Sequence, residues 1–318
     1  MVHRLVLIDG NSLLHRAYHA LPKTLTTSEG EVVNAVYGFT RMLLKVIKDL
    51  EPQYLAVAFD MKGPTFRHLE YEKYKEKRPE MEADLVAQLP LVKELLEDFE
   101  IPVYEVQGFE GEDVVASLNS QIPHTPRHQP LETVIVTGDR DALQLVSPNV
   151  RVYAPLKGLS NPVMYDADEV WKQYGLKPSQ IVDYKALRGD PSDNIPGVPG
   201  VGEKTAVELL QKYGTLAEVF NHLNELPERQ QKLLRDNRKP AELSKKLATI
   251  TCRAPVELDL EKCRVGDWRS ERARRVLEKL QFKSLVKELN ERQGNAKGNA
   301  KTQKGEKDAK NEAQMKLL

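Results

Sequence analysis

Cysteine and long apolar runs are scarce in this sequence. Only Cys252 and Cys263 occur among 318 residues, which excludes a disulfide framework or a zinc cluster and makes a reducing cytoplasm the expected compartment. The opening stretch MVHRLVLIDG is too short for a signal-peptide core, and no later run is long enough to span a membrane. An excess charge is also lacking, since 47 basic residues match 47 acidic ones. Composition alone therefore does not indicate a nucleic-acid binder, although acidic and basic regions can still be separated along the chain.

The apolar residues that are present form short runs. With 40% hydrophobic and 30% charged residues, the chain has the composition of a globular protein long enough for two domains. RLVLIDG, YLAVAFD and ETVIVTGDRD are typical of buried parallel strands, and helical patterns lie between them. IPVYEV and VRVYAP are candidates for further strands. This alternation predicts an α/β fold with a mostly parallel central sheet flanked by helices.

The pattern changes along the chain. From about residue 165 the strand signal disappears, and short helical segments separated by turns follow. The last stretch is of low complexity and almost free of large apolar residues, which predicts disorder. We therefore expect an α/β domain over 1–170, a helical domain over 171–290 and a disordered tail over 291–318.

Acidic residues follow each of the three main strands. Asp9, Asp60 and the pair Asp139 and Asp141 stand there. Ligands of open α/β sheets bind beyond the carboxyl ends of parallel strands, although a single Asp at such a place is more often a turn former or a helix cap. The stretch GFEGEDVVASL adds three acids at a predicted helix start, where the helix dipole alone would also explain them. They are Glu110, Glu112 and Asp113.

Together with two acids of GDPSDNIPGVPGVGEKTA, these residues predict a metal site. If the fold brings the acids together, nine carboxylates share one cleft and repel one another unless cations are present. Oxygen ligands without His or Cys select Mg²⁺ or Mn²⁺, and two such ions about 4 Å apart are typical of phosphodiester cleavage. The nine acids are Asp9, Asp60, Glu110, Glu112, Asp113, Asp139, Asp141, Asp190 and Asp193.

Six stretches in a fixed order resemble a known family. They are LIDGNSLLHRAYHAL, AVYGFTRML, AVAFDMKGPTFRHLEYEKYKEKRPEM, GFEGEDVVASL, TGDRDALQLV and GDPSDNIPGVPGVGEKTA. Over roughly residues 3–290 the chain resembles the 5′-nuclease domain at the start of bacterial DNA polymerase I, within the flap endonuclease superfamily. The resemblance implies a PIN-like nuclease core followed by a helix-hairpin-helix domain. Because no polymerase region follows, we expect a free-standing nuclease.

The resemblance also implies a division of the acids between two Mg²⁺ ions, for which Mn²⁺ can substitute. Asp139, Asp141, Asp190 and Asp193 would serve the second ion, and the other five acids the first. Glu112 departs from the family, which has Asp at this position, so its longer side chain puts direct ligation in doubt and favours ligation through water.

Basic residues are expected to meet the DNA. By resemblance, residues 61–90 form an arch over the site, with Lys75 and Arg78 near the scissile phosphate, although interleaved Glu residues also suit a solvated helix face. In the hairpin, Gly residues would let backbone approach phosphates, a helix N-terminus would face them, and the family places a K⁺ there. An ordinary Gly/Pro connection between helices is the alternative. The predicted DNA contacts are Arg16, Tyr18, Arg67, Gly197, Gly200, Gly202, Lys204 and Thr205.

These features predict a metal-dependent 5′→3′ exonuclease and 5′-flap endonuclease. Its substrates would be branched or nicked duplexes with a 5′ end, including RNA primers, in replication and repair. We expect a monomer associated with the nucleoid. A non-catalytic junction-binding module with a metal site weakened at Glu112 is the main alternative, and a ribonuclease of the wider superfamily is another.

The chain ends in QMKLL, which resembles the binding motif for the bacterial sliding clamp. Such a peptide would insert Met315, Leu317 and Leu318 into a hydrophobic pocket, while Gln314 forms a hydrogen bond at its rim. A tether of this kind raises local concentration without new contacts on the catalytic body. The alternative is that this match of five residues at the end of the chain is accidental.

Overall fold

The computed structural model describes residues 3–122, 131–155 and 162–290, and its centre is a six-stranded sheet. The strand order is β3-β2-β1-β4-β5-β6, in which every neighbouring pair is parallel except β5 and β6. The strands are β1 (His3–Asp9), β2 (Tyr54–Ala58), β3 (Val103–Tyr104), β4 (Leu131–Val136), β5 (Val150–Pro155) and β6 (Pro162–Tyr165). The predicted α/β class and its five strands are confirmed. β6 was not expected, because its four residues PVMY show no alternation of apolar and polar side chains, and the strand pairs only with β5 among the described strands.

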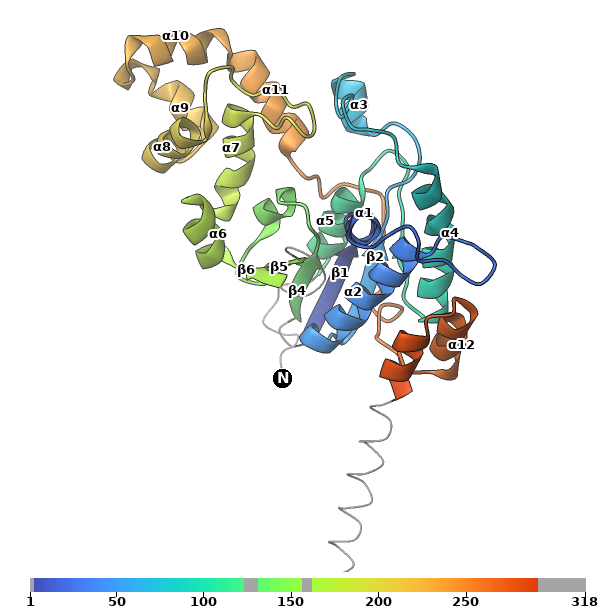
Figure 1. The fold of residues 1–318 in the computed structure, drawn as a ribbon. Helices are drawn as coiled ribbons and strands as arrows, with labels where there is room; N and C mark the ends of the chain where they lie inside the picture. The colour runs from blue at the N-terminus through green and yellow to red at the C-terminus, as the bar shows by residue number, and fades with distance from the viewer. Residues whose placement is uncertain (1–2, 123–130, 156–161, 291–318) are drawn as a thin grey trace, which may run out of the picture.

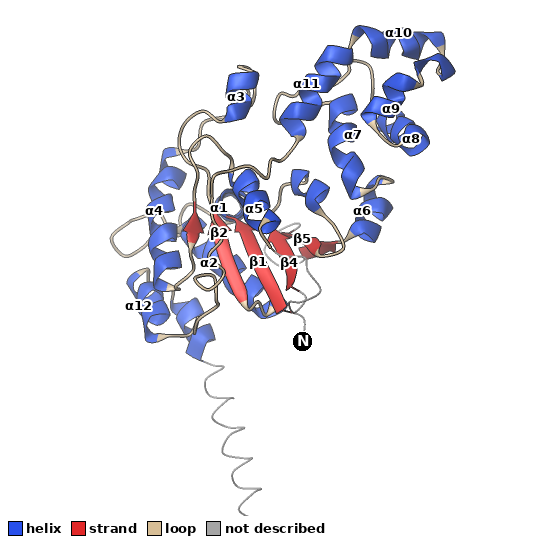
Figure 2. Ribbon diagram, turned by 180° about the vertical axis from the view of Figure 1, so that it is seen from behind, coloured by secondary structure: helices blue, strands red, loops and turns tan. Residues whose placement is uncertain are grey.

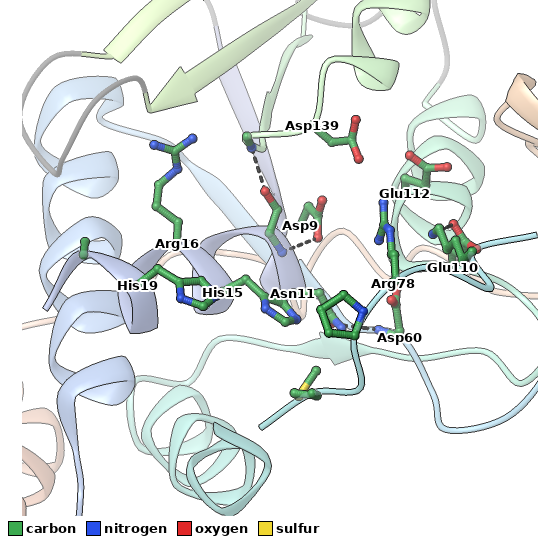
Figure 3. Close-up of a pocket in the computed structure, with 16 residues that line it drawn as sticks. Asp9, Asn11, His15, Arg16, His19, Asp60, Arg78, Glu110, Glu112 and Asp139 are labelled. Atoms are coloured by element: carbon green, nitrogen blue, oxygen red, sulfur yellow. Dashed lines mark hydrogen bonds and ion pairs between the residues drawn. The ribbon is translucent and has the colours of Figure 1, made fainter. Parts of the chain in front are cut away.

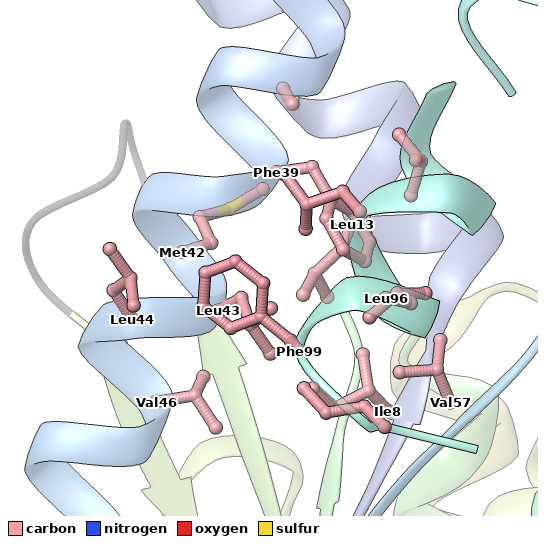
Figure 4. Packing of buried hydrophobic residues seen from close by; sticks show 14 of the residues in the cluster. Ile8, Leu13, Phe39, Met42, Leu43, Leu44, Val46, Val57, Leu96 and Phe99 are labelled. Atoms are coloured by element: carbon pink, nitrogen blue, oxygen red, sulfur yellow. The ribbon is translucent and has the colours of Figure 1, made fainter. Parts of the chain in front are cut away.

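Helices cover both faces of this sheet (Figure 1). Alternate residues of β1 point to opposite sides: Val6 and Ile8 belong to one apolar cluster, Leu5 and Leu7 to another. The first cluster packs against α1, α2 and α4, as Figure 4 shows in part, and the second against α5. The bounds of these helices are α1 (Gly10–Ala20), α2 (Asn34–Leu50), α4 (Ala83–Asp98) and α5 (Gly111–Ser120).

A second region is entirely helical, which confirms the predicted C-terminal helical domain. It has its own apolar core, centred on buried side chains such as Leu187, Leu210 and Val219. Its elements are α6 (Ala167–Tyr174), η2 (Pro178–Gln180), α7 (Ile181–Arg188), α8 (Glu203–Tyr213), α9 (Leu216–Asn221), η3 (Leu223–Glu225), α10 (Glu228–Asp236) and α11 (Arg238–Ala248). The short helix η1 (Asp141–Leu145) lies between β4 and β5 and packs in the second cluster of the sheet.

The turn between α7 and α8 is tightly closed. Gly189 and Gly197 have φ angles of +79° and +63°, in the left-handed region that favours glycine. A Cβ on Gly197 would lie 2.2 Å from the backbone nitrogen of Gly189. The close approach fixes Asp190 and Asp193, which stand inside this turn, relative to the end of α7.

The chain after α11 returns to the α/β core. α12 (Glu271–Lys279) buries Ala273, Val276 and Leu277 in the same apolar cluster as α2 and α4. Helical periodicity does not show which core a helix joins. The predicted helical domain over 171–290 included α12, but in the structure this helix packs on the α/β core.

The segment between β2 and α4 stands above the sheet on the same side as α11 (Figures 1 and 2). It contains α3 (Phe66–Glu70) and a series of turns. Tyr74 of this segment packs with Ile195 and Leu247 of the helical region in a small buried cluster. The segment predicted to form the arch thus joins the two regions.

Candidate active site

A cavity of about 800 Å³ opens where β1, β2 and β4 end (Figure 3). β1 supplies Asp9 directly, and the other acids follow strand ends or begin α5, so the sheet topology brings together positions distant in sequence. Residues of α1, including His15, Arg16 and His19, line it as well. Its acidic lining is Asp9, Asp60, Glu110, Glu112 and Asp139.

Neutral hydrogen-bond donors hold two of these acids in place. Asp9 accepts bonds from the backbone of Ser12 at 3.0 Å and the hydroxyl of Thr137 at 2.8 Å. Asp60 accepts one from the backbone of Gly111 at 2.5 Å. These contacts fix the carboxylates without supplying a compensating positive charge.

The electrostatics of the cavity penalise its negative charge. Burial raises the pKa of Asp9 to about 7, and the charges of Asp60 and Asp139 add to the shift against the hydrogen bonds to Asp9. Burial also raises the pKa of Asp60 and, more strongly, that of Glu112. A bound cation would relieve this penalty.

Three further acids form a second group beside the cavity. Ligand oxygens of Asp141, Asp190 and Asp193 lie within 4.8 Å of one another. Unlike Asp9 and Asp60, this trio is paired with cations of the chain. Nζ of Lys185 contacts Asp141 and lies 2.6 Å from Oδ2 of Asp190, and Arg78 lies 2.5 Å from Asp193. Although burial acts against it, Lys185 lowers the pKa of Asp190 to about 2.

Tyr74, Lys75 and Arg78 connect the two groups. The hydroxyl of buried Tyr74 lies 3.4 Å from Glu110 and 3.3 Å from Asp193. Nζ of Lys75 lies 2.7 Å from Glu110, while its backbone nitrogen donates to the carbonyl of Asp193. Arg78 lines the cavity and pairs with the trio. The predicted arch therefore presents cations between the two sets of acids.

Asp113 does not join either group. It is fully buried and forms a two-point ion pair with Arg67, at 2.7 and 2.9 Å. Arg67 is 1% exposed and also donates to the carbonyls of Leu247 and Thr249. The structure therefore corrects two expectations: Asp113 faces the interior instead of the cavity, and Arg67 has no surface with which to meet DNA.

Two other predicted DNA contacts, Tyr18 and Gly197, are also buried. Tyr18 is 2% exposed, and its hydroxyl donates to Asp84 at 2.8 Å, so it faces the protein and not the DNA side as expected. Gly197 is buried, and its N–H donates to the hydroxyl of Ser244, so this amide is not available to a phosphate.

Four predicted contacts do reach the surface at the start of α8. Gly200, Gly202 and Lys204 are exposed, and Thr205 is partly so. Gly202 is the N-cap of α8 and receives no side-chain cap, and the side chain of Lys204 is 91% exposed. This helix end can present amides and a positive charge to an anion.

The donors at both groups fit metal ions. All are carboxylate oxygens, which suit hard divalent cations, and the cavity acids have no cation of the chain on Asp9 or Asp60 in the described contacts. Asp139 lies with the cavity acids, whereas the resemblance placed it with the trio. The backbone of Asp141 donates to Asp139 at 2.9 Å, so the two groups adjoin at this point.

The residues predicted to bind a sliding clamp lie outside the part of the chain that the structure describes. They are Gln314, Met315, Leu317 and Leu318. Within residues 3–122, 131–155 and 162–290, no helix has the length and apolar character needed to cross a membrane.

Comparison with known proteins identifies the family. The family model "5′-3′ exonuclease, N-terminal resolvase-like domain" matches residues 4–175, and "5′-3′ exonuclease, C-terminal SAM fold" matches residues 176–271. The chain belongs to this 5′-3′ exonuclease family, which confirms the resemblance seen in the sequence.

Among curated relatives, DNA polymerase I of Caldicellulosiruptor bescii is 44% identical over 90% of this chain and 33% of its own length. That of Bacillus caldotenax is 42% identical over 91% of this chain and 32% of its own length. The chain thus spans about a third of the length of the curated relatives it matches.

Solved structures show the same fold. The bacteriophage T5 D15 flap endonuclease has a TM-score of 0.64 and 19% identity, covering 87% of this chain and 98% of its own. The catalytic core of Rad2 has a TM-score of 0.58 and 18% identity, covering 88% of each chain.

Sequence reasoning missed three features of the site. Lys185 was an ordinary lysine in a helical pattern, and Tyr74 one aromatic residue in a charged run. The pairing of Arg67 with Asp113 joins residues 46 apart. Each depends on tertiary placement. Tyr74, Arg67 and Asp113 stand in stretches that resemble the family, but those stretches do not show which residues pair.

Proposed function

We propose that this chain is a metal-dependent, structure-specific nuclease that cuts DNA near a 5′ end, as an exonuclease and as a 5′-flap endonuclease. One observation carries the proposal: five carboxylates from four separate segments of the chain meet in one cavity, under the cations of the arch. Opposed acids and cations of this kind suit a phosphodiester and divalent ions together.

Mg²⁺ is the proposed metal, with Mn²⁺ as a substitute. The cavity acids would hold one ion, with Glu112 contributing directly or through water, and Asp141, Asp190 and Asp193 a second. When bound, such ions supply activation of water and stabilisation of the leaving oxygen. The T5 flap endonuclease to which this chain is structurally similar is described with DNA and metal ions, which supports the proposal.

Lys75 and Arg78 would act on the reacting phosphate. Both side chains line the cavity while pairing with Glu110 and Asp193. Turning towards a phosphate would let them neutralise the charge that develops on its oxygens. Asp113 and Arg67 would position α5, which carries Glu112 and follows directly after Glu110, instead of contacting metal or DNA.

The start of α8 would bind the duplex. Gly200, Gly202, Lys204 and Thr205 offer exposed backbone, a free helix end and a cation, and we propose a K⁺ in this hairpin. Arg16, on the cavity wall, would contact the strand that is cut. Because the closed turn between α7 and α8 joins this surface to Asp190 and Asp193, the proposed grip on the duplex and the cutting site would stay at a fixed separation.

The biological setting follows from the chemistry. RNA primers and 5′ flaps in replication and repair are the proposed substrates, and a monomer in the cytoplasm, associated with the nucleoid, the proposed state. Recruitment to a sliding clamp through Gln314, Met315, Leu317 and Leu318 stays a prediction from the sequence, to be tested by a titration of clamp against chains with and without residues 314–318.

A labelled 5′-flap duplex tests the function. The purified chain should release the flap in the presence of Mg²⁺ and leave the duplex intact with EDTA. Binding of the flap duplex without cleavage at any Mg²⁺ or Mn²⁺ concentration would instead establish the alternative, a non-catalytic junction-binding module.

A further inference from the structure

One lysine occupies the second acidic group. Lys185 lies in the last turn of α7, and its side chain is only 14% exposed. Its ammonium contacts Oδ1 of Asp141 and lies 2.6 Å from Oδ2 of Asp190. Two acids from different elements therefore share this one cation of the chain.

Lys185 contacts the same carboxylates that a divalent ion would bind there. Asp141, Asp190 and Asp193 are the trio whose ligand oxygens lie within 4.8 Å of one another. An ammonium and a metal ion cannot both be in direct contact with the same oxygens, since the two cations repel and exclude one another. Even at the other oxygens of the same carboxylates, a metal ion would lie close to the ammonium, so the ammonium in this position disfavours metal binding at the trio.

The side chain can move while the helix stays in place. The backbone carbonyl of Lys185 accepts a hydrogen bond from Gly189 at 2.8 Å, at the start of the closed turn that holds Asp190. The ammonium is at the end of a flexible four-carbon stem. Rotation of this stem would free both carboxylates without shifting the backbone that positions them.

The same helix offers a matched ion pair away from the trio. Lys245 of α11 lies 2.6 Å from Oδ1 of Asp183, which is a buried acid of α7. Both lysines thus compensate an acid that is largely out of water. Only Lys185 does so at carboxylates that converge with a third.

We propose that Lys185 is an internal counter-ion that competes with metal for Asp141 and Asp190. In the metal-free protein it would hold the trio together against its own repulsion. By doing so it would set the metal concentration at which the second position fills. This inference rests on the proposed metal site, but it is tested by binding and needs no cleavage.

Calorimetric titration of the full chain with Mn²⁺, without DNA, tests this proposal. Lys185→Met should tighten the weaker class of sites about tenfold, because the competing charge is gone. Lys185→Arg keeps a positive charge and should stay within about threefold of the unsubstituted chain, as should Lys245→Met. Unchanged or weaker Mn²⁺ binding by Lys185→Met, or equal tightening by Lys245→Met, would overturn the proposal.

Lysine labelling keeps the test open if Lys185→Met does not fold. In the unsubstituted chain, the extent of acetylation at each lysine is measured by mass spectrometry. Acetylation of Lys185 should rise several-fold when Mn²⁺ saturates the site, while acetylation of Lys245 stays constant. Labelling of Lys185 that does not change with Mn²⁺ would mean that the ammonium never leaves the acids, and the proposal would be wrong. Failure of the nuclease assay with intact Mn²⁺ binding would count against the proposed function alone.

Discussion

The two acidic groups of this protein are compensated in different ways. Around the cavity, Asp9 and Asp60 receive hydrogen bonds from neutral groups, and burial raises the pKa of both. In the trio, Lys185 and Arg78 supply positive charge, and the pKa of Asp190 falls to about 2. Lys75 pairs with Glu110 at the cavity, but Asp9 and Asp60 have no direct cation of the chain in the described contacts, whereas each acid of the trio has one.

This difference suggests an order of metal binding. A cation entering the cavity relieves repulsion and meets no competing ammonium at Asp9 or Asp60 in the described contacts. A cation entering the trio meets the ammonium of Lys185. We therefore expect a tighter site in the cavity and a weaker one at the trio.

Removing one acid from each group should have the largest effect. Asp139→Asn and Asp190→Asn should each lower single-turnover cleavage of a 5′ flap by at least about 100-fold, because each group loses a ligand charge. Junction binding, measured by fluorescence anisotropy, should change far less, since the loss also reduces repulsion towards DNA. Cleavage at the unsubstituted rate by either variant would contradict the assignment of that group.

A double substitution sharpens the comparison. In Asp190→Asn the ammonium of Lys185 keeps only Asp141 as a partner, so adding Lys185→Met should restore part of the lost cleavage rate. The same addition to Asp139→Asn should restore none, because Asp139 has no described contact with Lys185. Equal rescue of both variants would show that the two groups are not separately compensated.

The buried ion pair between Asp113 and Arg67 should contribute to the stability of the fold. Asp113→Asn removes the two-point ion pair of the buried Arg67 guanidinium, which keeps only longer contacts to Glu110 at 3.7 Å and Glu112 at 3.4 Å, and it should lower the free energy of unfolding by about 3 kcal/mol. Urea denaturation of the metal-free chain measures this. Glu242→Gln, which breaks the exposed pair with Arg238, should cost less than about 1 kcal/mol and is the control. If the loss for Asp113→Asn appears only with bound metal, Asp113 is a ligand after all.

The arch and the helix end should separate cleavage from binding. Lys75→Ala and Arg78→Ala should lower the cleavage rate about 10- to 100-fold with little loss of duplex affinity, since they act at the reacting phosphate. Lys204→Ala should weaken duplex binding and reduce its salt dependence, with little effect on single-turnover cleavage of bound substrate. Parallel losses of rate and affinity in all three variants would remove this distinction.

The raised pKa of Asp9 predicts a pH effect in the metal-free chain. Asp9 ionises near pH 4 when unfolded but only at about pH 7 when folded, so the folded state binds its proton more tightly. Its contribution to stability is therefore complete below about pH 4 and is lost as the pH rises to about 7. Saturating Mg²⁺ should recover the loss, which melting curves from pH 5 to 8 would show. A metal-free chain that is most stable at pH 8 would contradict the prediction.

Glu112 should give the smallest effect. Glu112→Asp restores the residue that the family has and should keep or raise activity, whereas Glu112→Gln should weaken Mg²⁺ binding modestly. Rates measured against Mg²⁺ concentration decide this. If Glu112→Gln has an unchanged Mg²⁺ dependence, Glu112 does not serve the metal.

The sequence predicted the acids better than their partners. Asp9, Asp60 and Asp139 follow apolar strands, and parallel strands end at one edge, so their convergence could be foreseen. Asp113 could not be separated from Glu110 and Glu112, because Arg67 approaches it from another segment and turns it inward. β6 and the return of α12 depend in the same way on what they pack against. Side chains whose role comes from a distant partner are the ones that local pattern does not place.

A calorimetric Mn²⁺ titration of the unsubstituted chain, Asp9→Asn and Asp190→Asn tests the central claim most directly. The unsubstituted chain should show two classes of site. Asp9→Asn should lose the tighter class and Asp190→Asn the weaker one. A single class of site, or loss of the same class in both variants, would contradict the account of two acidic groups with different compensation.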